Sequence, residues 1–412
     1  MSWIDWLIVL VPVAFVWIMG YRSRKYIRGV ADFLSAGRIC GRYVICVADI
    51  ANALSIIGLV AFVEVHYKTG FALTFWQNLA LPLSIIMGLT GYCTYRFRET
   101  KAMSLGQFLE MRYSRKFRIF AAALRSLSEM LANMIMPAIA ARFFIYFLDL
   151  PHKVNWFGCE IPTFMLVVLT VLAVAISIIC MGGTLALVIT DSIQGMFCYP
   201  LLVLFVIFIL VKFSWANEIV PVMMDRSTGE SFLDPYDISK LRDFNLFYLG
   251  VTLFAVVFHR ASWIGAGNTT AAKSPHEQKM AGLLGTWRAA IGAIFYVLIA
   301  VTILTVMNHR NYADQARAIR MDIAQRVSGE VVENQAVRAE LMKNLNALPV
   351  ERHQIGADAP LSELRNTDTP YLETAHKTLA QDAEHGNSRF QQFRTLYHQM
   401  MMAMTMRHLL PV

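Results

Sequence analysis

Apolar stretches alternate with short polar or basic segments along the first 307 residues of the chain. A helix that crosses a bilayer needs about 20 predominantly apolar residues, and the stretches approach or exceed that length. We expect membrane-spanning helices at residues 3–20, 44–70, 71–95, 119–148, 162–180, 185–213, 244–267 and 283–307. This pattern predicts an all-α integral membrane protein with about eight transmembrane helices.

The distribution of lysine and arginine orients these spans. Both residue types gather in 21–42 and 96–118 and recur in 271–280, and basic loops of membrane proteins lie in the cytoplasm. The first apolar run has no basic residue before it, which distinguishes it from a cleaved signal peptide. The segment 214–243 carries few basic residues, as external loops do. Both termini are therefore expected outside the cell.

Composition agrees with a membrane location. The chain is 56% hydrophobic and only 16% charged, which lies well outside the composition of soluble domains. Its net charge of +8 is explained by the cytoplasmic loops, so no nucleic-acid partner is expected. We predict a multi-pass protein of the cell membrane, in contact with the lipid bilayer.

One span, from Val44 to Gly70, is unusually polar in its first half. It contains Asp49, Asn52 and Ser55, although a carboxylate at the centre of a membrane helix costs roughly 2.5–3.5 kcal/mol on insertion scales. Steps of three residues rotate around a regular helix, so these groups share one site most easily where the helix is locally unwound. The alternative is a polar patch whose groups are satisfied by neighbouring helices.

A second polar motif follows a glycine pair. Gly182 and Gly183 permit a tight turn between two spans, and Asp191 and Gln194 lie on the helix that follows. An acidic group at this depth can interact with a cation near its inner exit. A capping or structural pair is an equally good interpretation from chemistry alone.

A third polar pattern lies on the span 119–148. Arg125, Glu129 and Asn133 recur every four residues and share one face of the helix, where the first two can pair. We interpret them as a structural ion pair inside the bundle.

The glycine-pair motif resembles a known signature. The pattern G-G-x-x-A-x-x-x-T-D-x-x-Q is similar to that of the sodium:solute symporter family, and it is formed here by Gly182, Gly183, Ala186, Thr190, Asp191 and Gln194. ADFLSAGR (31–38), SLGQFLEMRYSRKFR (104–118) and AAKSPHEQKMAG (271–282) resemble that family's three cytoplasmic loops, in the same order. The similarity covers nearly all of residues 1–307 and touches the terminal MRHLLPV.

This resemblance implies a LeuT-like fold, in which an inverted five-plus-five helix repeat follows one extra N-terminal helix. It further implies that the backbone carbonyls of Ala51 and Leu54 bind sodium where the first repeat helix breaks, with Asn52 and Ser55 beside that site. Hard cations prefer such oxygen ligands. Gly58 stands where sugar-carrying members have a glutamine, which weakens the case for a sugar substrate.

The resemblance assigns three further site residues. Asp191 is expected to assist sodium near the inner exit. Phe258 falls near the family's aromatic inner gate, and His259 follows it in the same span. The His259–Arg260 pair either faces a water-filled cavity and contacts an anionic substrate, or snorkels or pairs within the bundle.

Residues 308–397 change to a soluble pattern. Apolar positions recur at helical spacing over 316–327, 337–345 and 371–383, and Ser328 and Gly329 are expected to interrupt the first of these helices. We interpret this region as an external helical insert. The predicted organisation is an extra helix and loop at 1–42, a first repeat at 43–213, an external loop at 214–243, two helices of the second repeat at 244–307, the insert at 308–397, and the start of a ninth helix at 398–412.

The family places further sodium ligands on a helix beyond this point. We therefore expect a C-terminally truncated chain with an incomplete second repeat, inactive in transport by itself. The predicted function is sodium-coupled symport of a small organic solute by alternating access, with sodium as coupling ion and no other cofactor. The alternative is a membrane solute sensor built on a symporter-like domain. An enzyme is not expected, because Asp49, His66 and His259 have no catalytic motif spacing.

Overall fold

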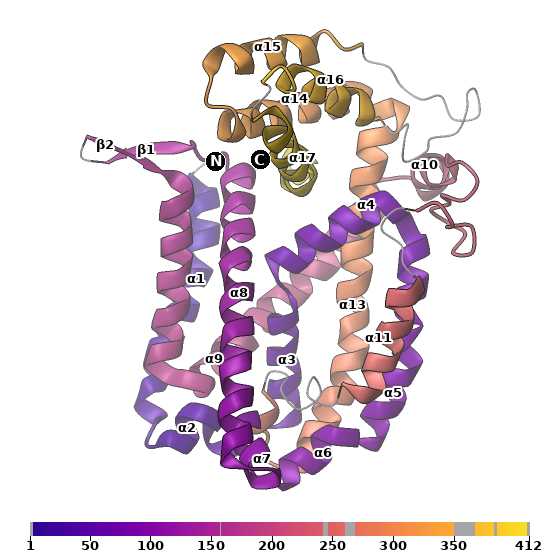
Figure 1. Ribbon diagram of the computed structural model, residues 1–412. Coiled ribbons are helices and arrows are strands. Elements are labelled where there is room, and N and C mark those ends of the chain that lie inside the picture. Colours follow the sequence, from indigo (N-terminus) through magenta and orange to yellow (C-terminus); the bar gives the residue numbers. More distant parts are fainter. Residues whose placement is uncertain are drawn as a thin grey trace.

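The computed structural model describes residues 3–156, 158–241, 246–259, 268–349, 367–382 and 385–409. Helices run the length of the molecule and are capped at one end by a group of shorter helices (Figure 1). The helices of the bundle are α1 (Trp3–Ser23), α3 (Arg42–Ala53), α4 (Ile56–Asn78), α5 (Ala80–Thr90), α6 (Tyr92–Glu99), α8 (Arg115–Phe147), α9 (Thr163–Lys212), α11 (Leu246–Phe258) and α13 (Pro275–Asn308).

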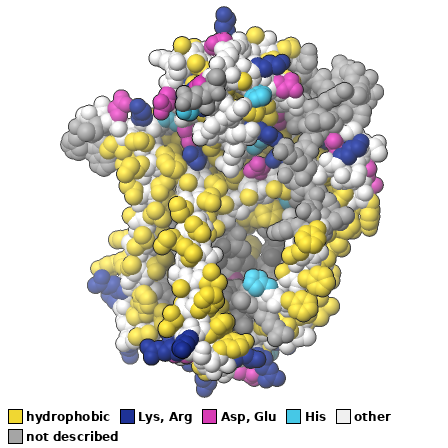
Figure 2. Space-filling model, viewed as in Figure 1, with side chains coloured by type: hydrophobic (Ala, Val, Ile, Leu, Met, Phe, Trp, Pro, Cys, Tyr) yellow, Lys and Arg dark blue, Asp and Glu magenta, His cyan; other side chains and the backbone are white. Residues whose placement is uncertain are grey.

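The surface has the polarity of a membrane protein. Hydrophobic side chains cover the middle of the molecule, and lysine and arginine side chains lie toward both ends, one of which is formed by α2 (Val30–Ser35), α6 and α7 (Leu105–Arg112) (Figure 2). Among the described residues, α1, α8 and α9 are each long and apolar enough to cross a membrane, and bent helix pairs raise that number to as many as five. The count of eight spans stays a prediction.

Helix α9 contains the turn expected at the glycine pair. Its 50 residues bend at Gly183, where φ is 50° and ψ is −144°. The first limb runs beside α1 and the second returns through the middle of the molecule (Figure 1). A Cβ atom on Gly183 would lie 2.4 Å from the carbonyl oxygen of Phe33, so only glycine fits. The prediction of a tight turn at this point is confirmed.

Helix α4 bends where two of the expected spans meet. Gly70 has φ 57°, and the segment Ile56–Ala72 meets the segment Thr74–Glu99 at 94°. The bend is held from outside the helix, because the backbone N–H groups of Phe71 and Ala72 both donate to the carbonyl of Phe232, at 2.9 and 3.1 Å. The segment that contains Phe232 thus fixes the bend of α4.

Hydrogen bonds join the segments at the end formed by α2, α6 and α7. This end is called the inner end after the predicted orientation, and the opposite end is called the outer end. Cys40 N donates to Ala271 O at 3.1 Å, and Lys273 N donates to Cys40 O at 2.9 Å. Arg98 donates to the Ala272 carbonyl through Nε and Nη2. Glu277 accepts from the backbone and side chain of Arg42, with Nη2 at 2.5 Å. Segments that are far apart in sequence therefore form one connected inner end.

Residues 151–162 contain a β-hairpin, so the all-α prediction is wrong in this detail. Strand β1 (Lys153–Trp156) pairs antiparallel with β2 (Cys159–Pro162), and Lys153 lies opposite Pro162. Lys153 Nζ and Glu160 Oε2 lie 2.8 Å apart across the pair. Short alternating strands give a weak sequence signal, so the sequence indicates only an external loop here.

Arg125 and Glu129 on α8 form the predicted ion pair, but the pair does not lie inside the bundle. Arg125 Nε lies 3.7 Å from Glu129 Oε1, yet the two side chains are 56% and 60% exposed. Asn133 donates to the Glu129 carbonyl at 2.8 Å. The interpretation as an ion pair inside the bundle is therefore wrong for the described residues, because helical spacing fixes a shared face and not what covers it.

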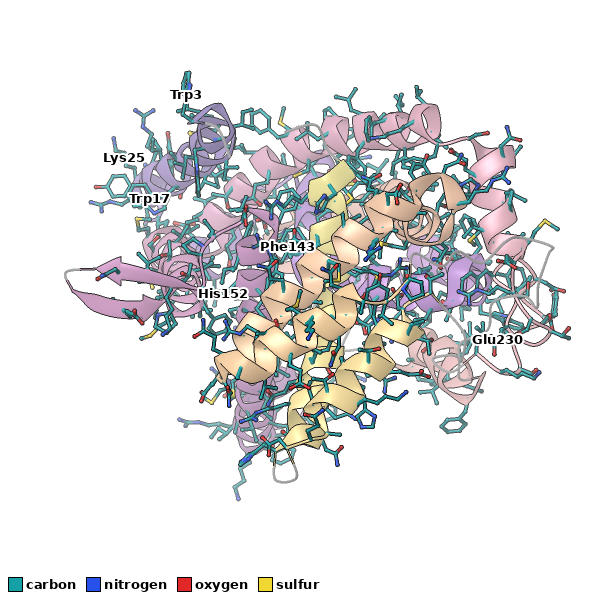
Figure 3. The ribbon with its side chains drawn as sticks, turned by 90° about the horizontal axis from the view of Figure 1, so that it is seen from above. Trp3, Trp17, Lys25, Phe143, His152 and Glu230 are labelled. Atoms are coloured by element: carbon teal, nitrogen blue, oxygen red, sulfur yellow. The ribbon has the colours of Figure 1, made fainter. Side chains whose placement is uncertain are left out.

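The expected insert forms a helical cap over the outer ends of the bundle, as the view from above shows (Figure 3). The three helical patterns correspond to α14 (Ala313–Val331), α15 (Gln335–Asn346) and α16 (Thr369–Leu379). Ser328 and Gly329 lie inside α14, so the expected interruption is wrong. The boundary drawn at 397/398 falls inside α17 (Gly386–Leu409), which is continuous across it.

The cap shares one hydrophobic core with the bundle. Ile323 of α14 and Met404 of α17 are fully buried in the same cluster as Ile303 of α13 and Tyr146 of α8. A buried ion pair lies in this region, with Arg320 Nε 2.7 Å from Asp368 Oδ1. The cap is therefore integral to the outer half of the molecule.

Candidate functional site

The helix formed by the polar stretch is broken at Leu54 and Ser55. Helix α3 ends at Ala53 and α4 begins at Ile56. Ser55 has extended backbone angles, φ −118° and ψ 143°, and its Oγ accepts a hydrogen bond from Gly58 N at 2.9 Å. Serine is a favoured N-cap because its short side chain satisfies an N–H group that has no partner within the helix. The sequence therefore sets both the break and the restart of the helix.

This break leaves backbone oxygens without intrahelical partners. The last four carbonyls of an α-helix have no N–H donor within the helix, and Ala51 is among the last four residues of α3. Leu54 lies in the break itself. Both predicted sodium ligands therefore belong to the segment whose carbonyl oxygens have no donor within the helix. Their role as sodium ligands stays a prediction.

A cavity of about 320 Å³ opens beside the break. Leu54, Ser55, Ile56 and Leu59 form one wall, and the other walls come from α9 and α13. The side chains contributed by those two helices are Cys198, Leu201, Leu202, Phe205, Phe295 and Tyr296. This volume lies in the range of small-molecule sites, and the lining is largely apolar with the Ser55 and Tyr296 hydroxyls among its few polar groups.

The lining residues from α9 and α13 were not predicted, although those on α9 follow a recognisable sequence pattern. Residues 198, 201, 202 and 205 follow the i, i+3, i+4, i+7 spacing of one helical face. Nothing in the sequence pairs that face with Ser55. In the structure, Tyr296 of α13 connects the lining to the break. Its hydroxyl interacts with the Ser55 backbone, and its ring lies 5.5 Å from that of Phe62 on α4.

Asp49 has a partner on another segment. Its Oδ1 accepts from Asn268 Nδ2 at 3.1 Å and from Asn268 N at 3.4 Å. Asn268 is buried and directly precedes the short helical turn Thr269–Ala271. These hydrogen bonds fit the interpretation of Asp49 as a satisfied polar group that links α3 to the inner end of the fold.

Asp191 lies on the second limb of α9, on the inner side of the break. Its neighbour Ser192 donates to Val44 O at 3.3 Å, and a Cβ on Gly195 would lie 2.6 Å from Val47 Cγ1. This part of α9 is therefore level with residues 44–47, and Leu54 is roughly 15 Å further along the helix axis at 1.5 Å per residue. Asp191 does not join Ala51 and Leu54 in one ligand set.

The remaining predicted site residues are separate from the cavity. Phe258 is 68% exposed and stacks on Phe254 with ring centres 6.1 Å apart. Helix α11 lies beside the α5–α6 segment, and Tyr92 donates to Val257 O at 3.1 Å. His259 is exposed at the end of α11. Phe258 and His259 do not line the cavity beside the break.

Three predicted features have little or no structural description. Asn52 lies on α3, but its side chain is outside the described part of the chain, as is Arg260. Gly58 belongs to the first turn of α4, where a Cβ would lie 2.8 Å from Ser55 Oγ. Within the described ranges, no group of three or more His, Cys, Asp and Glu residues is arranged to hold a metal ion.

Comparison with known proteins identifies the type of fold. No protein-family model and no curated protein matches the chain. The structure does match that of a Na+-coupled sialic acid symporter in a substrate-bound, outward-open state. The chain has a transporter fold. The TM-score is 0.58 and the sequence identity is 17%, over 98% of this chain and 80% of the symporter. At this identity the likeness concerns the fold alone.

Proposed function

We propose that this protein is a sodium-coupled secondary transporter of a small organic solute that works by alternating access. The observation that carries the proposal is the helix break at Leu54 and Ser55 beside a cavity of about 320 Å³. Discontinuous helices supply unwound carbonyls for cations at the midplane of transporters of this kind. The matched structure is a Na+-coupled symporter, which agrees with this assignment.

Each group has a defined task under this proposal. The Ala51 and Leu54 carbonyls hold sodium, and Asn52, Ser55 and Gly58 border the solute. Asp191, on the inner side, receives sodium as it leaves toward the cytoplasm. Phe258 and His259 belong to a gate that approaches the cavity in another conformation. The proposed fold is a LeuT-like inverted repeat preceded by α1, with about eight spans and both termini outside.

Sodium supplies enough free energy for accumulation. A membrane potential of 100 mV yields about 2.3 kcal/mol per charge, and each tenfold sodium gradient adds about 1.4 kcal/mol. One sodium ion per solute therefore supports a solute gradient of several hundredfold under these conditions. ATP-driven transport finds no support, because the sequence contains no Walker motif.

Sodium binding can be tested separately from transport. The thermal midpoint of the purified protein is measured in sodium and in potassium at equal ionic strength. A ligand that binds only the folded state stabilises it by about 2.7 kcal/mol at 100 times its dissociation constant, so sodium should raise the midpoint. Equal midpoints in the two salts over the full concentration range would contradict sodium coupling.

A pair of serine caps provides a matched control. Ser55→Ala removes the cap at the break, which costs about 1 kcal/mol, and should also reduce the sodium-induced shift because the carbonyls beside it lose their fixed geometry. Ser104 caps α7 in the same way, accepting from Gln107 N at 3.2 Å. Ser104→Ala should lower the midpoint without changing the response to sodium.

The role of Asp191 has its own test. Asp191→Asn removes a charge on the exit side, and we expect it to raise the sodium concentration needed for half-maximal stabilisation or uptake. Asp314→Asn, at a position on the cap helix α14 far from the inner end, is the control. An unchanged sodium requirement in Asp191→Asn would remove Asp191 from the mechanism.

The solute is identified by binding to the purified protein, measured in sodium and in potassium at equal ionic strength. A panel of labelled sugars, amino acids, carboxylates and vitamins is used, headed by sialic acid because the matched symporter carries it. The sensor alternative is not favoured, since the matched structure belongs to a transporter. Solute binding that is equally strong in sodium and in potassium would revive that alternative.

A further inference from the structure

A second cavity, of about 530 Å³, lies at the outer end of α9. It is lined by the end of α9, the π-helical turn η3 (Trp215–Ile219) and the segment that joins α13 to α14. It shares no lining residue with the cavity beside the helix break. Single π-helical turns are rare and occur often at functional sites.

One rim of this cavity is apolar and exposed. Leu210 is 53% exposed, Val211 81% and Trp215 46%. They continue the exposed apolar face of α9 formed further inward by Leu204 and Ile207. In a membrane protein such a face contacts acyl chains, and tryptophan marks the level of the lipid headgroups. The cavity therefore opens at the boundary between hydrocarbon and headgroups.

The lining of this cavity also contains basic residues. Lys212 lies with Nζ 5.3 Å from the centre of the Phe208 ring and 3.1 Å from the Leu409 carbonyl oxygen. Arg310 is exposed and forms no ion pair with any residue in the described ranges. His309 lies beside it, with Nδ1 accepting from Asn311 N at 3.2 Å. Two permanent positive charges thus border the cavity.

One acidic residue, Glu218, also lines the cavity. Glu218 Oε2 accepts from Ser214 N at 2.8 Å, and Oε1 accepts from the Tyr312 hydroxyl at 2.9 Å. Partial burial opposes its ionisation, but the hydrogen bonds from Ser214 and Tyr312 and the nearby His309 hold its pKa below the usual value. An ionised carboxylate has about four acceptor positions, so Glu218 can accept further donors.

We infer that this cavity binds the headgroup of a zwitterionic phospholipid that carries a primary amine. The phosphate lies toward Lys212 and Arg310, and the ammonium group donates to Glu218. The acyl chains follow Leu210 and Val211 along α9. A purely anionic headgroup leaves Glu218 facing negative charge, and a quaternary ammonium has no N–H to donate. The chemistry therefore selects a phosphoethanolamine headgroup over phosphoglycerol or phosphocholine.

The experiment compares three lipids with identical dioleoyl chains. Purified protein is freed of lipid in detergent, and native mass spectrometry measures retention of phosphatidylethanolamine, phosphatidylcholine and phosphatidylglycerol. We expect phosphatidylethanolamine to be retained best. Arg310→Ala should weaken its binding about tenfold, since a hydrogen bond to a charged group contributes about 1.5 kcal/mol. Glu218→Gln should remove the preference over phosphatidylglycerol.

A control variant and a soluble competitor test whether the intact lipid occupies this cavity. Lys343→Ala removes a cation on α15 that does not line the cavity and should leave retention unchanged. Soluble O-phosphoethanolamine should not displace the lipid. Equal retention of the three lipids, wild-type retention in both cavity variants, or displacement by O-phosphoethanolamine at an equal concentration would each overturn the inference. If Glu218→Gln fails to fold, exposed Arg310→Ala and the lipid comparison on the wild type still decide.

Discussion

The ion pair between Arg320 and Asp368 is expected to anchor the cap to the bundle. Their side chains are only 5% and 0% exposed. Arg320 Nη2 also donates to Met307 O on α13 at 2.9 Å, and the Tyr67 hydroxyl on α4 donates to Asp368 Oδ2 at 2.7 Å. Although burial opposes the charged form of Asp368, Arg320 holds the pKa of that carboxyl below its usual value.

Arg320→Met removes the charge while retaining a long apolar side chain. It leaves the buried Asp368 carboxylate without the guanidinium, and removing one partner of a buried ion pair costs about 3–5 kcal/mol. Asp368→Leu should cost a similar amount, because it leaves a buried guanidinium. The double variant should cost less than either single variant, since replacing both members by apolar groups is often close to neutral.

The assay is thermal unfolding of purified single and double variants, followed by far-ultraviolet circular dichroism. Lys153→Met serves as control, because its pair with Glu160 is about two-thirds exposed on both sides and surface pairs contribute little. Single variants that unfold like the wild type, or a double variant whose loss equals the sum of the two, would refute the reasoning.

Two further predictions concern the bends and the inner end. Gly183→Ala forces a residue with a Cβ to φ 50° against the Phe33 carbonyl, so we expect a loss of about 1–3 kcal/mol. Gly282→Ala, inside α13 with open space around it, should by the same measurement cause no loss and should stabilise by up to about 1 kcal/mol. Hydrogen bonds from the Arg42 side chain and backbone lower the pKa of Glu277 to about 2. A group whose pKa is lower in the folded state stabilises the fold above its unfolded pKa, and this stabilisation is lost as the pH falls. The thermal midpoint of the wild type should therefore exceed that of Glu277→Gln near neutral pH, and the difference should disappear between about pH 5 and pH 2. A difference that stays constant over this range would exclude a stabilising role of the Glu277 charge.

The sequence predicted local features well where one residue type dictates geometry. The turn at Gly183 and the local unwinding of the polar span were predicted, whereas the bend at Gly70 and the capping of α4 by Ser55 were recognised only in the structure. The reason is that positive φ and N-capping depend on the residue itself and its immediate neighbours. The same logic misjudged Ser328 and Gly329, because packing of α14 against α17 outweighs the weak helix propensity of two residues.

The candidate site was only partly predictable. The break was placed correctly, and its backbone oxygens follow from it. The opposing wall of Cys198, Phe205 and Tyr296 depends on how α9 and α13 approach the break. The resemblance places Asp191 near the inner exit and Ala51 and Leu54 at the break, but only the register of α9 against α3 shows that Asp191 lies roughly 15 Å from Leu54 along the axis.

By itself, the sequence determined that this is a helical membrane protein with a basic inner end and a polar, broken helix. These properties are sums over local composition and short-range backbone preferences. Only the tertiary structure decided which faces are covered: the exposed Arg125–Glu129 pair, the cap joined through Arg320 and Asp368, and the two cavities along α9. Periodicity defines a face of a helix, but its partner depends on contacts between residues far apart in the chain, which no local pattern encodes.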